Sequence, residues 1–110
     1  MKALSIKQSW ANMILTGIKD IENRSWPTWF RGRIIVHASQ SYDFTFPGDY
    51  QPLPRGSLLG EVDIIDCVTY SSSPWFSGPY GFVLANPMLY PSPIPYKGRL
   101  GLFNAYPGLS

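Results

Sequence analysis

Residues that form disulfides and metal sites are scarce in this sequence, which has one cysteine and one histidine among 110 residues. The single cysteine, Cys67, excludes an intrachain disulfide, and one Cys with one His cannot supply the ligands of a Cys/His zinc site. Disulfide scaffolds and zinc fingers are therefore excluded, and we expect neither a cofactor nor a bound metal. The low cysteine content also makes the cytoplasm the expected compartment.

Long apolar runs are also missing. No stretch approaches the ~18 residues of a membrane span, and residues 1–5 lack the apolar core of a signal peptide. We therefore expect no membrane partner. Charged residues make up only 15% of the chain, whereas 45% is hydrophobic and 15% aromatic. This composition predicts one domain spanning residues 1–110, and we expect a monomer, although nothing in the sequence fixes the oligomeric state.

Charge is distributed unevenly along the chain, although the net charge is only +2. Residues 1–33 contain six cations and two carboxylates, a net charge of +4, whereas residues 34–70 contain one cation and five carboxylates, a net charge of −4. One interpretation is a positive face that attracts phosphates. The other is that the two segments pair across a sheet, and the sequence leaves both open.

One helix is predicted, over residues 10–16. Trp10, Met13 and Ile14 recur at the spacing of an apolar helical stripe. Ser9 precedes this stripe and is expected to cap the helix with its hydroxyl. Gly17 stands where a left-handed residue ends a helix.

The remaining segments predict a β-rich fold with many turns, in keeping with 10 glycines and 11 prolines. Alternating or apolar runs predict strands, and Ser-, Gly- and Pro-rich stretches predict loops. The expected strands cover 2–6, 19–26, 33–39, 57–69, 80–85 and 100–105, and the expected loops cover 40–56, 71–79 and 87–95. The fold class is therefore mainly β (α+β), a closed or half-closed barrel of five to six strands with one short N-terminal helix.

Alternation predicts the faces of the two longest central strands. In 33–39, Ile34 faces the core with its alternate neighbours, and His37 lies on the opposite face. In 57–69, Leu58 and Asp66 fall on the core face, so Asp66 is expected to need a cation or backbone donors. Gly60 is expected to mark a bend or bulge, and Cys67 to be a buried small residue.

The segment after the helix brings opposite charges together. Lys19, Glu22 and Arg24 lie within six residues. Lys19 and Arg24 are suited to clamp a phosphate, Arg as a planar fork and Lys as a point charge. Glu22 either holds one of these cations or, with a pKa raised by burial, acts as a general base. The alternative is a surface ion-pair network without a ligand.

Together with its surroundings, this cluster resembles the ASCH domain family, a branch of the PUA-like β-barrels. The family's G-x-K-x-x-E-x-R signature is matched by Gly17, Lys19, Glu22 and Arg24. Ser9 departs from the family, which usually has proline before Trp10, and the loop between residues 39 and 56 is short for it. Other stretches that follow the family in order are 4–11, 31–39, 60–62, 66–68, 73–76, 78–84 and 97–101.

The resemblance implies a PUA-like barrel with a cleft beside the signature strand that binds single-stranded RNA or a modified nucleoside. Some relatives look like metal-independent single-stranded RNA nucleases, which makes Lys19, Glu22 and Arg24 the candidate catalytic residues. Another branch consists of amidohydrolases that deacylate N4-acetylcytidine with a Lys and a Thr in this strand. Glu22 occupies the Thr position here, so deacylation would need water activated by Glu22 or Glu61. A non-catalytic interaction module is the remaining alternative.

Aromatic and polar residues near the expected cleft complete the candidate ligand site. Aromatic rings displayed on loops stack on bases, contributing about 1–3 kcal/mol per base, whereas the alternative is that most rings fill the core. Trp10 and Phe82 are expected to be structural. His37 is either an acid–base group or a hydrogen-bonded structural residue, and the acidic side chains of 61–66 either bind a metal or are paired. The predicted ligand-binding residues are Trp26, Arg31, Arg33, His37, Ser39, Glu61, Trp75 and Tyr80.

Overall fold

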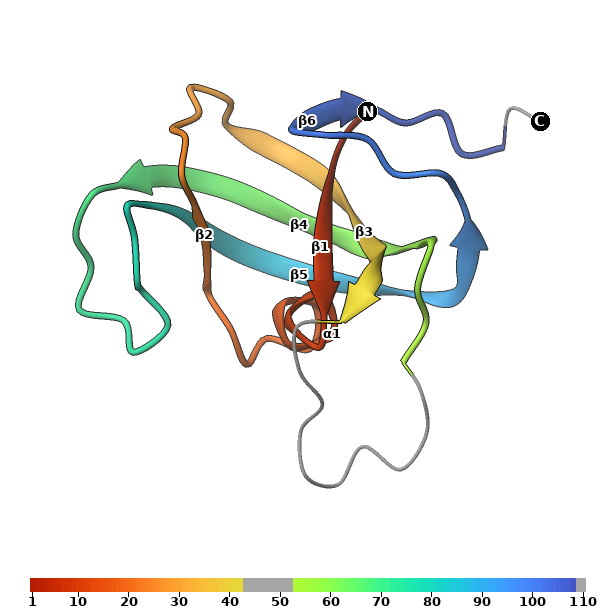
Figure 1. Ribbon diagram of the computed structural model, residues 1–110, viewed down its shortest axis with the longest axis horizontal. Coiled ribbons are helices and arrows are strands. Elements are labelled where there is room, and N and C mark those ends of the chain that lie inside the picture. The colour runs from red at the N-terminus through yellow and green to blue at the C-terminus, as the bar shows by residue number, and fades with distance from the viewer. Residues whose placement is uncertain (43–52, 109–110) are drawn as a thin grey trace.

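The fold is taken from a computed structural model that describes residues 1–42 and 53–108. These residues form one helix and a six-stranded sheet with the strand order β2-β5-β4-β3-β1-β6. Strands β1 and β3 are parallel, and the other neighbouring strands are antiparallel. In chain order (Figure 1) the elements are β1 (Lys2–Gln8), α1 (Trp10–Leu15), β2 (Ile21–Arg24), β3 (Gly32–Tyr42), β4 (Ser57–Val68), β5 (Tyr80–Pro95) and β6 (Leu102–Asn104).

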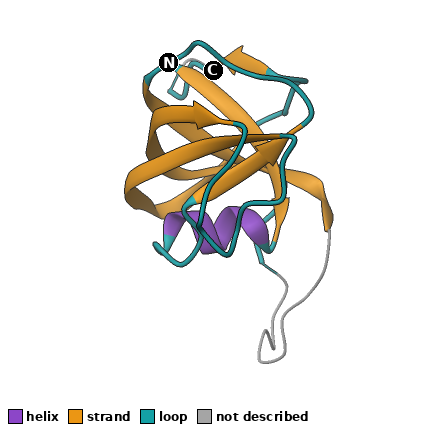
Figure 2. Ribbon diagram, turned by 90° about the vertical axis from the view of Figure 1, so that its left-hand side faces the viewer, coloured by secondary structure: helices purple, strands orange, loops and turns teal. Residues whose placement is uncertain are grey.

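The sheet curls strongly into a half-open barrel, and α1 lies across one end of it (Figure 2). This arrangement confirms the predicted mainly β, PUA-like fold with one short N-terminal helix. Helix α1 has six residues, and no helix in the described part of the chain is long and apolar enough to cross a membrane.

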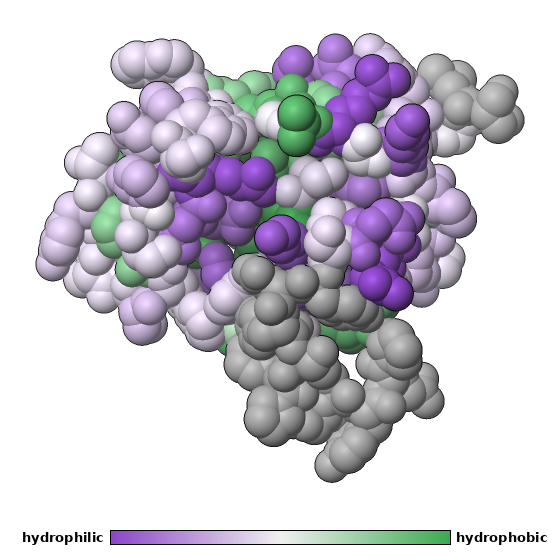
Figure 3. Space-filling view, in the orientation of Figure 1, coloured by the Kyte–Doolittle hydropathy of each residue, from purple (hydrophilic) through white to green (hydrophobic). Residues whose placement is uncertain are grey.

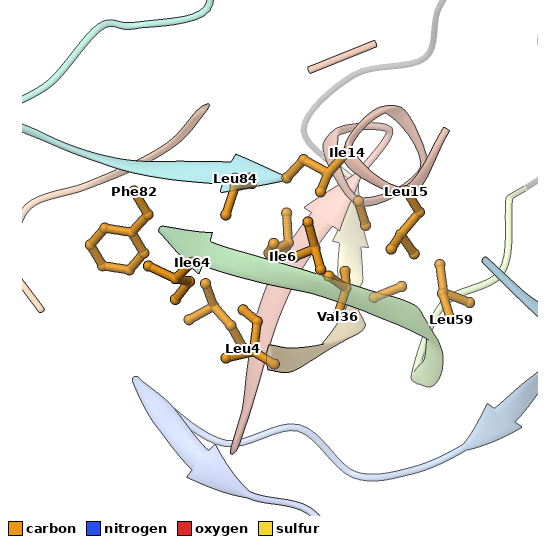
Figure 4. Packing of buried hydrophobic residues seen from close by; sticks show 13 residues of the cluster. Leu4, Ile6, Ile14, Leu15, Val36, Leu59, Ile64, Phe82 and Leu84 are labelled. Carbon is orange, nitrogen blue, oxygen red and sulfur yellow. The ribbon is translucent and has the colours of Figure 1, made fainter. Parts of the chain in front are cut away.

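The main core fills the inside of the curl. Side chains from four strands and α1 meet there (Figure 4), and Phe82, expected to be structural, is fully buried among them. A second, smaller cluster covers the other face of β3 and contains Ile35 and Phe103. Because β3 is covered on both sides, Ile34 and His37 are both buried although they point to opposite faces. The main core contains Leu4, Ile6, Ala11, Ile14, Leu15, Ile34, Val36, Ala38, Leu59, Val62, Ile64, Phe82 and Leu84.

The first half of β4 departs from simple alternation. Its pairing with β5 shifts between Leu58 and Gly60. Leu59 therefore enters the main core, and Leu58, which was predicted to do so, packs in the second cluster. Gly60 was expected to mark a bulge, and it lies at this shift. A Cβ atom at Gly60 would overlap the carbonyl oxygen of Met88, so the two backbones approach closely there.

The second half of β4 contains another shift, between Ile64 and Asp66. The prediction that Asp66 faces the core is therefore wrong, because its side chain is 58% exposed. Its carboxylate lies 3.6 Å from Nη2 of Arg31 and accepts a 2.8 Å hydrogen bond from the backbone N–H of Cys67. Cys67 is half-buried and packs against the main core.

The prediction of a loop over 87–95 is wrong, because β5 continues through this Pro-rich segment. Its far end pairs with β4, with Pro95 opposite Ser57 and Ile94 opposite Leu58. Strand β2 pairs only with residues 80–83 of β5 among the described residues, so the far half of β5 has an open side. Prolines at 91, 93 and 95 alternate, which places their missing N–H groups on one side of the strand, where proline is tolerated.

The ends of α1 are only partly as predicted. Ser9 makes no side-chain capping bond, and the backbone N–H of Asn12 is instead accepted by Oε1 of Gln8 at 3.0 Å. Gly17 has a positive φ of 83°, as expected after a helix. The predicted loop over 40–56 begins later, since β3 runs to Tyr42, and its part at 43–52 lies outside the described residues.

Candidate ligand-binding site

The candidate site lies at a seam in the curled sheet. Strand β6 pairs with Lys2–Leu4 of β1, and β2 is at the opposite end of the strand order. Among the described residues no backbone ladder joins β2 to β1. Arg24 spans this seam, because its Nη2 donates a 2.6 Å hydrogen bond to the carbonyl oxygen of Ser5. A side chain therefore links the two strands where a backbone ladder would close a full barrel.

A pocket of about 920 Å³ opens at this seam, and we call it the seam pocket. Its volume lies within the ~300–1,000 Å³ of sites that enclose small molecules. Strongly hydrophilic residues surround a hollow near the middle of the face shown in Figure 3. The pocket is lined by Ser5, Ile6, Lys7, Trp10, Lys19, Glu22, Asn23, Arg24, Ser25, Trp26, Ser39, Ser41, Pro74, Trp75, Phe76 and Ser77.

Glu22 is held between two cations in the wall of the seam pocket. Its Oε2 accepts a 2.9 Å hydrogen bond from Nε of Arg24, and its Oε1 lies 3.7 Å from Nζ of Lys19. Lys19 also donates to the carbonyl oxygen of Ile21, and its ammonium lies 5.2 Å from the centre of the Trp10 ring. Lys19 and Glu22 are only 4% and 7% exposed. The charged cluster is thus buried in a pocket wall and is not a surface ion-pair network.

Burial shifts the proton affinities of this pair. Desolvation raises the pKa of Glu22 above its ordinary 4.5, against the attraction of Arg24 and Lys19. Desolvation also lowers the pKa of Lys19 below its ordinary 10.5, against the attraction of Glu22. Both shifts favour the neutral forms, because a buried charge loses its hydration. A carboxyl and an ammonium whose pKa values are shifted toward each other are suited to proton transfer when they lie in a pocket.

The turn after α1 explains how Lys19 reaches Trp10. Gly17 adopts the left-handed conformation, and the backbone N–H groups of Ile18 and Lys19 then both donate to the carbonyl oxygen of Met13, at 2.9 and 3.1 Å. The chain reverses within this turn, which brings Lys19 back beside the first residue of the same helix. The glycine and lysine of the signature therefore act as one structural unit.

Tryptophan rings form the other walls of the seam pocket. Trp10 and Trp75 meet edge to face with their centroids 6.1 Å apart, and the guanidinium of Arg24 lies 5.9 Å from the ring centre of Trp26. Trp10 was predicted to be structural; it is half-buried, packs against the main core and also lines the pocket. Because Trp10 is the first residue of α1, its ring lies at the margin of the core and faces Lys19.

Asn23 fixes the loop that carries Trp75. Its Nδ2 donates a 2.9 Å hydrogen bond to the carbonyl oxygen of Trp75. Its Oδ1 accepts hydrogen bonds from the backbone N–H groups of Ser77 and Gly78, at 2.9 and 3.1 Å. Sequence reasoning did not single out Asn23. The available signal was an amide side chain between two signature residues, since amides satisfy the irregular backbone of a nearby loop.

Six of the predicted catalytic and ligand-binding residues line the seam pocket, namely Lys19, Glu22, Arg24, Trp26, Ser39 and Trp75. The others lie elsewhere. Tyr80 is half-buried opposite Arg24 in the β2–β5 pair but does not line the pocket. Arg31 is exposed, and it donates to the carbonyl oxygens of Thr28 and Phe30 and approaches Asp66.

Arg33 and Glu61 form a separate network with Asp63. Nε of Arg33 lies 3.2 Å from Glu61, and its Nη1 lies 3.1 Å from Asp63. Glu61 also accepts a 2.7 Å hydrogen bond from the hydroxyl of Tyr90. Hydrogen bonds from Asn86 and Arg33 lower the pKa of Asp63. In the described residues no three His, Cys, Asp or Glu side chains are grouped as a metal site requires.

His37 is a buried, fully bonded residue away from the seam pocket. It is 2% exposed, its Nδ1 lies 2.7 Å from Oγ of Ser5, and its Nε2 lies 2.7 Å from the carbonyl oxygen of Tyr96. These contacts match the structural alternative for this histidine, in which both ring nitrogens are satisfied.

Comparison with known families places most of the chain in one family. The family model described as the ASCH domain matches residues 4–103. The chain belongs to the ASCH domain family. It is 33% identical to activating signal cointegrator 1 of Homo sapiens and 32% identical to that of Mus musculus, in each case over an alignment of 123 positions that covers 87% of the chain. The chain spans about a fifth of the length of these relatives, 21% in both cases. In this ASCH domain, the lysine, glutamate and arginine of the signature share one pocket.

Proposed function

We propose that this ASCH domain binds single-stranded RNA, or a nucleoside-sized part of it, in the seam pocket. The observation that carries the proposal is the convergence of tryptophan rings and cations on one hollow, with Arg24 and Lys19 each beside a ring. Rings bind base faces, and cations bind the phosphates between them. In a duplex both faces of a base are covered by stacked neighbours, so the proposed ligand is single-stranded.

Metal-independent cleavage of the bound strand is a second candidate, favoured by the buried Lys19–Glu22 pair. Glu22 as a carboxylate takes the proton of a ribose 2′-hydroxyl, and the 2′-oxygen attacks the adjacent phosphorus. The bond from phosphorus to the 5′-oxygen breaks, and the leaving oxygen takes a proton from Lys19, which leaves a cyclic phosphate and a 5′-hydroxyl. Arg24 stabilises the charge that develops on the phosphorane. His37, the other base considered, does not line the pocket.

Nucleoside deacylation has less support in the geometry. Of its two water-activating candidates, Glu61 is bound by Arg33 and Tyr90 outside the seam pocket. Of the two, only Glu22 lines that pocket. The experiments below therefore include results that would identify a deacylase or a pure interaction module.

The test of binding is the affinity for a fluorescent single-stranded RNA at several salt concentrations. We expect K19M and R24Q each to lower affinity by about 10-fold or more, because a charge-assisted hydrogen bond contributes about 1.5–3 kcal/mol. R24Q is also expected to reduce the salt slope by about 0.7, the value for one phosphate contact to a single strand. R55A is the charge-matched control, since Arg55 is exposed and lines neither this pocket nor any other described here.

Two results would contradict the binding proposal. Equal losses in R55A and R24Q would show attraction by net charge alone. If the wild-type protein retains no RNA at low salt, the non-catalytic interaction module is the function that remains.

Product analysis separates binding from catalysis. A nuclease yields fragments without added metal, and E22Q abolishes them while still binding RNA. A pure binder yields no fragments at any time. Release of acetate from N4-acetylcytidine in the same incubation, lost in E22Q, would instead identify a deacylase.

A further inference from the structure

A second pocket lies near the chain's C-terminal strand. It has a volume of about 660 Å³, and we call it the C-terminal pocket. Its walls include the rings of Tyr96, Phe103 and Tyr106 and the side chains of Lys97 and Arg99. It shares no lining residue with the seam pocket.

We propose that the C-terminal pocket is a second binding site for a phosphate-bearing nucleotide, and that one RNA strand occupies both pockets. The first part stands on the chemistry of this pocket alone. The second part rests on the proposed function of the seam pocket.

The charge of the C-terminal pocket is of one sign. Lys97 and Arg99 are exposed, and within residues 1–42 and 53–108 neither has an ion-pair or hydrogen-bond partner. Lys2 lies directly opposite Asn104, a lining residue, in the β1–β6 pair, which adds a third cation on the neighbouring strand. Arg31 and Arg33, by contrast, are engaged with carboxylates. Cations without protein partners favour an anionic ligand.

Aromatic rings make the same pocket suited to a nucleotide. Tyr106 is 52% exposed, so one ring is available to stack on a base. The backbone N–H of Tyr106 donates a 3.0 Å hydrogen bond to the hydroxyl of Tyr96, which fixes the two residues relative to each other. In this arrangement the ring can stack on the base of a nucleotide while the neighbouring cations bind its phosphate.

The backbone that carries the two cations is firmly held. A Cβ atom at Gly98 would lie 2.5 Å from Oγ of Ser5 and 2.6 Å from Cε1 of His37, so only glycine allows this approach. His37 also binds the carbonyl oxygen of Tyr96. Lys97 and Arg99 therefore project from a segment packed directly on buried groups.

A chain of hydrogen bonds links the two pockets. Ser5 binds Arg24 of the seam pocket through its carbonyl oxygen and His37 through its hydroxyl, and His37 binds Tyr96 of the C-terminal pocket. The longest dimension of the molecule is 37 Å. Small barrels of comparable architecture bind roughly 4–16 nucleotides, so a strand near the upper end of this range is expected to reach both pockets.

The test compares labelled single-stranded RNAs of roughly 4 and roughly 12 nucleotides, the two ends of the range bound by one small barrel. For the longer RNA, K97A and R99A are each expected to lower affinity several-fold and to reduce the salt slope by about 0.7. For the shorter RNA, which fills the seam pocket alone, both variants are expected to match the wild-type protein. R55A is the charge-matched control and is expected to match it for both.

The outcomes separate this inference from the proposed function. If K19M weakens the longer RNA but K97A and R99A do not, the C-terminal pocket is not a nucleotide site and the inference is overturned. A titration with uridine 5′-monophosphate followed by NMR tests the pocket without any strand. Shifts at residues 96–106 that are lost in R99A support the second site even where the seam pocket binds nothing, and their absence overturns it.

Discussion

Glu22 is the residue on which the proposed chemistry of the seam pocket depends. Burying a carboxylate is costly, and Arg24 and Lys19 offset part of this cost. The raised pKa of Glu22 shows that desolvation outweighs their attraction. Such an arrangement stabilises the fold less than a well-packed apolar side chain, which favours a functional role for the cluster.

The pH dependence of stability follows from this shift. Because the pKa of Glu22 is higher in the folded than in the unfolded protein, its ionisation costs stability as the pH rises from about 4.5 through the folded-state pKa. E22Q removes that cost. The unfolding free energy of E22Q minus that of the wild type is therefore expected to increase with pH over this window and then level off. Urea unfolding at a series of pH values measures it, and a constant or falling difference would contradict the raised pKa.

Asp63 provides a control of opposite sign. Its pKa is lowered in the folded protein by hydrogen bonds from Asn86 and Arg33. Its contribution to stability is therefore present above its ordinary value of 3.8 and is lost as the pH falls through the folded-state pKa. D63N is expected to have a lower unfolding free energy than the wild type at neutral pH. This difference in unfolding free energy is expected to shrink as the pH falls into the acid range.

Single residues were predictable where a local motif sets their position. Lys19 and Arg24 follow from the signature, and both line the seam pocket. Trp10 packs against the main core as its helical spacing predicts, but spacing does not show that the first residue of a helix lies at the margin of the core and also lines a pocket. His37 lines no seam-pocket wall because the C-terminal segment covers its face of β3, a long-range contact that alternation cannot reveal.

At the scale of elements, β2 organises the site by its side-chain bonds to a loop. Asn23 makes three hydrogen bonds to the backbone of residues 75–78, which carries the Trp75 ring. The same strand supplies Glu22 and Arg24 to the pocket. Strand and loop therefore act together as one wall.

N23A is expected to loosen this wall. Loss of the three bonds leaves backbone groups without their partner, and because these bonds are part-buried or exposed the expected cost is at or below the low end of the about 1–3 kcal/mol of a buried group. We expect a lower unfolding free energy and several-fold weaker RNA binding, with the salt slope unchanged because no phosphate contact is lost. Anisotropy at several salt concentrations and urea unfolding measure both effects, and N12A on α1 is the matched control. Binding equal to wild type would show that the loop is positioned without Asn23.

The limits of β5 show what element prediction misses. Proline normally argues against a strand, and 87–95 contains four prolines. The strand forms there because β2 is short and leaves the outer side of β5 open. That condition depends on the neighbouring strand, so the local sequence does not contain it. The turn at Gly17 and the bulge at Gly60, by contrast, follow from local backbone requirements and were predicted.

At the scale of the whole molecule, the cations of residues 1–33 lie in two different surroundings. Arg31 and Arg33 pair with carboxylates of β4, which is the pairing interpretation of the charge pattern. Lys7, Lys19 and Arg24 line the seam pocket. The pairing alternative therefore holds for Arg31 and Arg33, and the phosphate-attracting face stays a prediction for the cations of the seam pocket. The mainly β class was predictable from composition and periodicity, but the strand order was not, because the parallel β1–β3 pair and the seam depend on long-range contacts.

The central claim is that the seam pocket is where RNA binds. The most direct measurement is an NMR titration of the isotopically labelled protein with a single-stranded RNA of roughly four nucleotides, the short end of the range for one small barrel. We expect the largest shifts at residues 19–26 and 74–77 and on the Trp10 indole, and we expect K19M to abolish them. Shifts that avoid these residues, or that persist unchanged in K19M, would contradict it.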